Sequence, residues 1–190
     1  FRLRFEIDKA KAASMPKENI ERAIAKATTE LTNLEDVIYE GFGPGGIGII
    51  VEAATDNKNR SAQEIKNTFE KGGGSMAGMG SVSFNFVKTG FMLVKKMNNP
   101  EEDLLKLIDA GAEDVNENEE GIEVYVSTDK FSQVRSKILA NGFEIIEMEL
   151  EMKPLNLVKL NSSDSEKAIK LIESFEALDD VNKVFTNLDV

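Results

Sequence analysis

The sequence FMLVKKMNNPEEDLLKLIDAG at residues 91–111 contains a strand pattern followed at once by a helix pattern. It begins with a short apolar run, which is typical of a buried strand. The helix is expected to begin with Asn99 as N-cap and Pro100 at its first position, and to end at Gly111. Glu102 has the capping-box spacing at which its side chain can bond back to the N-cap backbone. The positions that we expect to face inward on this helix are Leu104, Leu105 and Ile108.

The residues after Gly111 extend this pattern to a complete unit. We predict strands at 113–116 and 122–127, a helix at 130–140 and a long strand at 144–151. Together with the first strand and helix, residues 91–152 have the order β-α-β-β-α-β. This order is typical of a ferredoxin-like unit.

A second set of elements lies on both sides of this unit. Before it we predict a strand at 47–53, a helix at 59–71, which has capping-box spacing at Ser61 and Glu64, and a strand at 82–86. After it we predict a strand at 155–160, a helix at 164–177 and a strand at 181–185. We therefore expect a split ferredoxin-like domain at 36–90 and 154–190, with an inserted acidic ferredoxin-like domain at 91–153.

The first part of the chain has a different pattern. Residues 1–14 and 16–28 have apolar residues at three-to-four spacing, and Pro16 suits the first position of the second helix. We predict a truncated helical domain at 1–35, whose first helical partner is expected before Phe1. The expected fold class is α+β, with this helical domain followed by two ferredoxin-like domains.

The composition excludes several kinds of chemistry. The chain has 190 residues, a net charge of −11, and neither cysteine nor histidine. Disulfides, Cys/His zinc sites, thiolate nucleophiles and Ser-His-Asp triads are therefore ruled out. We expect no catalytic residues, metal or cofactor, and a non-enzymatic function. Since the sequence shows neither a long apolar run nor a signal-peptide pattern, we expect a cytoplasmic protein that makes no membrane contact.

Positive charge is concentrated near the start of the chain. Residues 1–27 hold seven basic and four acidic side chains, whereas residues 28–190 hold 16 basic and 30 acidic ones. An acidic body repels phosphate, so only the first part has the sign that nucleic acid requires. A basic helical pair can also be an ordinary solvated surface. The candidate nucleic-acid-binding residues are Arg2, Arg4, Lys9, Lys11, Lys17, Arg22, Lys26 and Arg60.

Two glycine-rich segments are candidates for partner contact. Residues 41–46, GFGPGG, match the G-x-G-x-x-G spelling of a dinucleotide loop, but a strand pattern follows where a helix is required. We therefore expect a turn there. The run at 72–81 is either a flexible connector or a loop that becomes ordered on a partner. The glycines that we assign to a partner-contact loop are Gly41, Gly43, Gly45, Gly46, Gly73 and Gly74.

Several motifs resemble those of one protein family. MPKENIERAI at 15–24, YEGFGPGG at 39–46, TDNKNR at 55–60, AGAEDV at 110–115 and LDDV at 178–181 occur in that family's order. On these motifs the chain resembles the YebC/PmpR family, which also includes the mitochondrial translational activator of cytochrome oxidase. The family's basic Gly-His-Ser-Lys-Trp opening is not part of this sequence.

The resemblance implies three domains and a non-enzymatic role in gene expression. It implies a DNA-binding transcriptional regulator, while some family members act instead in translation at stalled ribosomes. The expected partner is nucleic acid, either promoter DNA or ribosomal or transfer RNA. The acidic domains are expected to contact the ribosome or other proteins. A further alternative is that the chain serves only as a protein-interaction scaffold. We expect the protein to be a monomer.

Overall fold

The computed structural model describes residues 2–30, 34–97 and 99–189. Contacts between residues divide the chain into two compact units. Unit 1 consists of Leu3–Val87 and Pro154–Val190, and unit 2 consists of Lys88–Lys153. Helices and antiparallel sheets occur together in the chain, so the predicted α+β class is confirmed.

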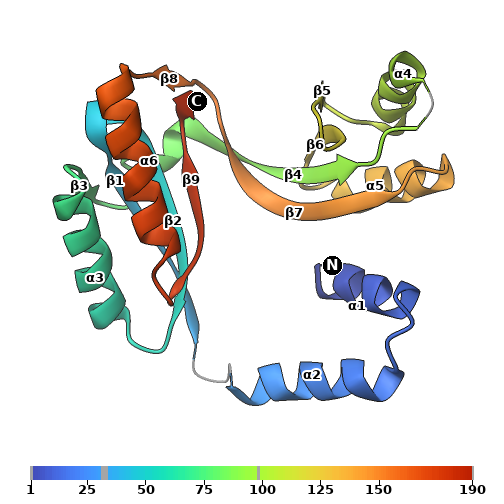
Figure 1. Ribbon diagram of the computed structural model, residues 1–190, viewed down its shortest axis with the longest axis horizontal. Coiled ribbons are helices and arrows are strands. Elements are labelled where there is room, and N and C mark those ends of the chain that lie inside the picture. Colours follow the sequence, from blue (N-terminus) through green and yellow to red (C-terminus); the bar gives the residue numbers. More distant parts are fainter. Residues whose placement is uncertain (1, 31–33, 98, 190) are drawn as a thin grey trace. The chain divides into compact units, whose positions relative to one another are not determined.

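Unit 1 begins with two helices, α1 (Arg2–Ala12) and α2 (Lys17–Glu30) (Figure 1). Pro16 lies directly before α2, not at its first position as predicted. Its carbonyl oxygen accepts the backbone N–H groups of Asn19 and Ile20, at 3.0 and 3.3 Å. Proline suits this place because an N–H group at a helix start has no intrahelical partner.

The sheet of unit 1 has the strand order β3-β1-β2-β9. Its strands are β1 (Glu35–Phe42), β2 (Gly48–Thr55), β3 (Ser75–Ala77) and β9 (Val181–Thr186). Helices α3 (Lys58–Lys71) and α6 (Ser162–Glu176) cover one face of it (Figure 1). The core between helices and sheet contains Tyr39, Ile47, Ile49, Val51, Ala53, Ile65, Phe69, Ala168, Leu171, Phe175 and Leu188.

Two predicted strands of unit 1 are wrong. Residues 83–85 form a short 3₁₀ helix, η2 (Ser83–Asn85). Within 155–160 only β8 (Val158–Lys159) is extended, and it pairs with β10 (Leu188–Asp189) in a separate two-stranded sheet. The main sheet is completed instead by β1, which pairs with β2 along eight residues across the short 3₁₀ turn η1 (Pro44–Gly46). A short connection loses less entropy on closure than a long one, which favours β1.

Helices α3 and α6 of unit 1 both begin with an asparagine cap, and the cap of α3 is not the predicted Ser61. The side chain of Asn57 accepts the N–H of Arg60 at 3.2 Å, and the side chain of Asn161 accepts the N–H of Asp164 at 3.0 Å. Ser61, predicted as a cap, is buried one turn inside α3. Its hydroxyl lies 2.7 Å from that of Thr55.

Unit 2 follows the predicted order β-α-β-β-α-β. Its elements are β4 (Phe86–Val94), α4 (Pro100–Ala110), β5 (Asp114–Glu117), β6 (Ile122–Ser127), α5 (Phe131–Ala140) and β7 (Ile145–Pro154). The strand order is β5-β6-β4-β7. Unit 1 has the same spatial arrangement, because β1 takes the place that β6 has in unit 2. The two units differ in chain order, since β1 comes before the other strands of unit 1, whereas β6 comes after β4 and β5 in unit 2.

Helix α4 faces its sheet with a different side from the predicted one. Of the three residues predicted to face inward, Leu104 is half-buried, and Leu105 and Ile108 are 63% and 50% exposed. The buried residues of α4 are Asp103, Leu107 and Ala110. The carboxylate of Asp103 accepts the backbone N–H of Met97 at 2.7 Å. This bond favours the burial of Asp103, and the residues four and seven positions later lie on the same face. Asn99 is the N-cap, but its side chain makes no capping hydrogen bond.

Candidate nucleic-acid interface

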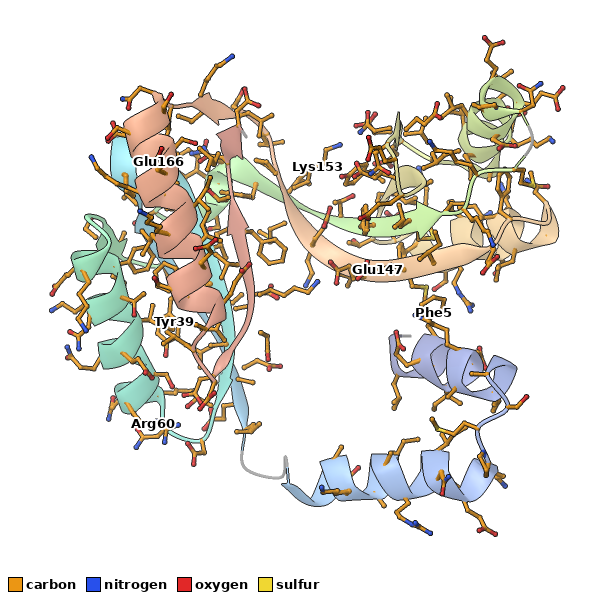
Figure 2. All side chains as sticks on the ribbon, in the orientation of Figure 1. Phe5, Tyr39, Arg60, Glu147, Lys153 and Glu166 are labelled. Carbon is orange, nitrogen blue, oxygen red and sulfur yellow. The ribbon has the colours of Figure 1, made fainter. Side chains whose placement is uncertain are left out.

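Helices α1 and α2 present most of the predicted nucleic-acid-binding residues. Phe5 on α1, which is labelled in Figure 2, and Ile20 on α2 are buried apolar residues, each 7% exposed. The cationic residues are Arg2, Arg4, Lys9 and Lys11 on α1, and Lys17, Arg22 and Lys26 on α2. Apart from Arg2, whose side chain lies outside the described set, all of these side chains are exposed.

Two of these cations, Lys11 and Lys17, form long ion pairs within their own helices. Lys11 lies 3.8 Å from Asp8, and Lys17 lies 3.4 Å from Glu21, with all four side chains largely in solvent. Exposed pairs of this kind contribute little free energy and exchange readily for other anions. Among the described side chains, Arg4 and Arg22 have no ion-pair partner. The two helices therefore carry positive charge that a phosphate group can reach.

Arg60 has a different environment from the helical cations. Its guanidinium group lies at the start of α3, 2.9 Å from a carboxylate oxygen of Asp56 and 3.1 Å from one of Asp180. Its hydrogen bond and attraction to Asp180 raise the pKa of Arg60. Asp180 also accepts hydrogen bonds from Ser61 and Thr55, and the bond from Ser61 is the largest cause that lowers the Asp180 pKa. Because two carboxylates match its charge, we leave Arg60 out of the proposed interface.

The predicted partner-contact glycines lie in two places in unit 1. Gly41 is on β1, and the turn after β1 contains Gly43, Gly45 and Gly46. Gly73 and Gly74 connect α3 to β3. A Cβ atom at Gly41 would lie 2.6 Å from the Phe69 ring and from the carbonyl oxygen of Ser75. Gly41 is thus required for packing, whereas an added Cβ at Gly46 or Gly73 would meet no atom within 4 Å.

The structure also reveals a buried carboxylate that the sequence did not single out. Glu40 on β1 is 4% exposed. Its carboxylate accepts the backbone N–H groups of Gly80, Val82 and Ser83 at 2.8, 2.6 and 2.9 Å. Burial raises the pKa of Glu40, but these hydrogen bonds outweigh burial, and the net pKa is lowered. An acid within a strand pattern is the signal that could have drawn attention to it.

Among residues 2–30, 34–97 and 99–189, no three carboxylate, histidine or cysteine groups are placed to hold a metal ion. Within the same residues, no helix combines the length and the apolar character needed to cross a bilayer.

Comparisons with known proteins agree with the sequence motifs. Residues 34–188 match the family model described as the second and third domain of TACO1/YebC. The chain is 47% identical, over its whole length and 78% of the relative's, to a probable transcriptional regulatory protein of Thermoanaerobacter pseudethanolicus. It is 42% identical to a protein of the same description from Thermotoga maritima, over its whole length and 76% of that relative's.

A solved structure gives the same result for the fold. The crystal structure of a conserved hypothetical protein from Aquifex aeolicus has a TM-score of 0.84 and 40% sequence identity to this chain. The match covers 96% of this chain and 77% of that one. The similarity of sequence and fold confirms the predicted relationship, and this chain belongs to the TACO1/YebC family.

Proposed function

We propose that the chain is a non-enzymatic regulator of gene expression that binds promoter DNA through α1 and α2. The observation that supports this function is the exposure of cationic side chains on these two helices, in a chain whose net charge is −11. Phosphate backbones are attracted only to the cationic part of such a chain. The relatives' description as probable transcriptional regulatory proteins supports DNA as the target.

The side chains on α2 favour phosphate contact over base recognition. Lys17 is paired with Glu21, and Glu18 lies beside Lys17 in the first turn of the helix. Carboxylates so close to the cations repel the phosphates on either side of a groove. We therefore propose contacts that position the chain on a duplex, with little discrimination between sequences.

A binding series with charge variants tests this function. The hairpin variant R4Q/K11Q/R22Q removes three exposed positive charges from α1 and α2. The control variant K95Q/K106Q/K130Q removes three from unit 2, where each lysine is exposed and lies within 4.0 Å of a glutamate. Binding to a labelled promoter duplex is measured by anisotropy across a salt series. We expect the hairpin variant alone to bind about tenfold more weakly at low salt, with a shallower salt dependence.

A ribosomal role is the second candidate, and the mixed charge of α2 favours it. Acidic side chains lie beside the cations of α2, so this helix is poorly suited to reading bases. It suits recognition of shape and phosphate, which is the usual mode for structured RNA. Co-sedimentation of the same variants with ribosomes separates the two functions. If the chain sediments with ribosomes but does not bind the duplex, translation is the function. If the hairpin variant matches the control in both assays, α1 and α2 are not the interface.

A further inference from the structure

A groove runs between α3 and α6 in unit 1. The end of α3 lies beside the middle of α6, because a Cβ atom at Gly72 would be 2.5 Å from the Leu171 side chain. The start of α3 lies beside the residues after α6, where Arg60 bonds to Asp180. The two helices thus run in opposite directions side by side (Figure 1). Two adjoining cavities of about 550 and 570 Å³ lie along them, and both are lined by Thr68 and Lys71.

The first cavity, which we call the lysine pocket, is lined by ionisable side chains of one sign. Its lining consists of Thr68, Lys71, Gly72, Gly73, Lys167, Lys170, Leu171 and Ser174. The α6 residues 167, 170, 171 and 174 share one helix face. No carboxylate lines this pocket, whereas Glu64 and Arg60 both line the second cavity. The lysine pocket is therefore cationic, although the chain as a whole has a net charge of −11.

The ammonium groups are the donors that this pocket offers. The hydroxyls of Thr68 and Ser174 donate to carbonyl oxygens of their own helices, at 3.0 and 2.6 Å. The N–H groups of Gly72 and Gly73 bond to carbonyls in the last turn of α3. These groups are satisfied already, so a ligand of the pocket must be attracted by the lysines.

The lysines themselves are only partly neutralised. Lys167 lies 2.9 Å from Asp164, and the pKa of Asp164 is lowered chiefly by its hydrogen bond with Lys167. Lys71 and Lys170 have no ion-pair partner among the described side chains. Three lysines around one cavity, with a single carboxylate paired beside it, have the charge to bind a polyanion.

We propose that the lysine pocket binds the phosphate backbone of a nucleic-acid strand, as a contact additional to α1 and α2. This inference rests on the proposed function, since it gives the same ligand a second site. Charge complementarity identifies the occupant as a polyphosphate. No aromatic side chain lines the pocket, so bases cannot stack there and the contact is independent of sequence. Gly73, which has open space beside it, leaves room for the strand to approach.

The test compares three variants that each remove three positive charges. They are the pocket variant K71Q/K167Q/K170Q, the hairpin variant and the control variant defined above. Binding of the fluorescein-labelled promoter duplex to each chain is measured by anisotropy across a salt series, and a thermal melt of each chain checks its folding. We expect the pocket variant to bind about tenfold more weakly than the control at low salt. The slope of log affinity against log salt should become shallower by about three, as for three lost phosphate contacts on duplex DNA.

The other outcomes separate the lysine pocket from the interface on α1 and α2. If the pocket variant matches the control while the hairpin variant loses affinity, the lysine pocket is not a site but the proposed function stands. If all three variants weaken equally, net charge alone decides binding and both proposals fail. If inorganic phosphate competes with the labelled duplex as strongly as unlabelled duplex does at equal phosphate concentration, the occupant is a small anion and this inference is overturned.

Discussion

The carboxylate of Glu40 accepts a 2.6 Å hydrogen bond from the backbone N–H of Val82, which lies 42 residues further along the chain. The same carboxylate also accepts the N–H groups of Gly80 and Ser83. One side chain on β1 therefore fixes the segment that leads from the glycine-rich loop into β4. Buried N–H groups require partners, and this segment has no sheet neighbour to supply them.

Substitution of Glu40 by glutamine should destabilise unit 1. An amide has one acceptor oxygen, and its NH₂ group would face an N–H group that Glu40 now satisfies. We expect E40Q to lower the free energy of unfolding by about 2–3 kcal/mol, as for loss of hydrogen bonds to a buried charged group. Urea denaturation measures the change. The control E52Q alters a half-buried acid on the neighbouring strand and should change stability by less than about 0.5 kcal/mol.

The same carboxylate predicts a pH dependence of stability. The pKa of Glu40 is lowered from 4.5 in the folded chain, so the unfolded chain binds its proton first as pH falls. The stabilisation by Glu40 is complete above pH 4.5 and is lost as pH falls through the lower, folded pKa. Unfolding free energies measured from neutral pH downward should therefore decline less steeply for E40Q than for the unchanged chain. Parallel declines would contradict the assignment.

Alanine at Gly41 should disrupt packing, whereas alanine at Gly78 should not. The Cβ atom of G41A would lie 2.6 Å from both the Phe69 ring and the Ser75 carbonyl oxygen, so β1 or α3 must shift. We expect a loss of about 1–3 kcal/mol, as for other overpacked cores. At Gly78 the nearest atom is 3.9 Å away. Thermal unfolding of both variants is the measurement, and equal melting temperatures would show that Gly41 is not tightly packed.

Two neighbouring leucines on α4 should respond differently to truncation. Leu107 is fully buried, whereas Leu105 is 63% exposed. We expect L107A to cost about 2–4 kcal/mol through loss of buried surface and creation of a cavity. L105A should change the unfolding free energy by less than about 0.5 kcal/mol. Denaturant titration followed by circular dichroism compares them, and a larger effect at Leu105 would support the helix orientation predicted from the sequence.

Elements that depend on local spacing were predictable from the sequence. The strand and helix order of residues 91–152 is confirmed, and so is the strand after the glycine motif at 41–46. Apolar periodicity and capping residues act within a few residues of one another, so they can be recognised without the fold. The orientation of α4 was not predictable. It depends on a hydrogen bond between Asp103 and Met97, and the leucines alone gave no indication of that bond.

The candidate nucleic-acid interface was also predictable only in part. The concentration of positive charge at residues 1–27 follows from counting alone. That Arg60 is paired with Asp180, 120 residues away, does not. The lysine pocket was also missed, since Lys71 belongs to one helix and Lys167 and Lys170 to another that follows about 90 residues later. Groups so far apart in sequence come together only through the packing of two helices on one sheet.

The sequence by itself determined the α+β class, the family and the polarity of charge, because these depend on residue types and short spacings. Only the tertiary structure decided which strand completes the sheet of unit 1 and which charges are matched. Residues 35–42 fill the place that was predicted for 155–160, and Glu40 thereby meets the N–H groups of residues 80–83. Strand pairing and ion pairing depend on distances in space, and local periodicity carries no information about partners on distant segments.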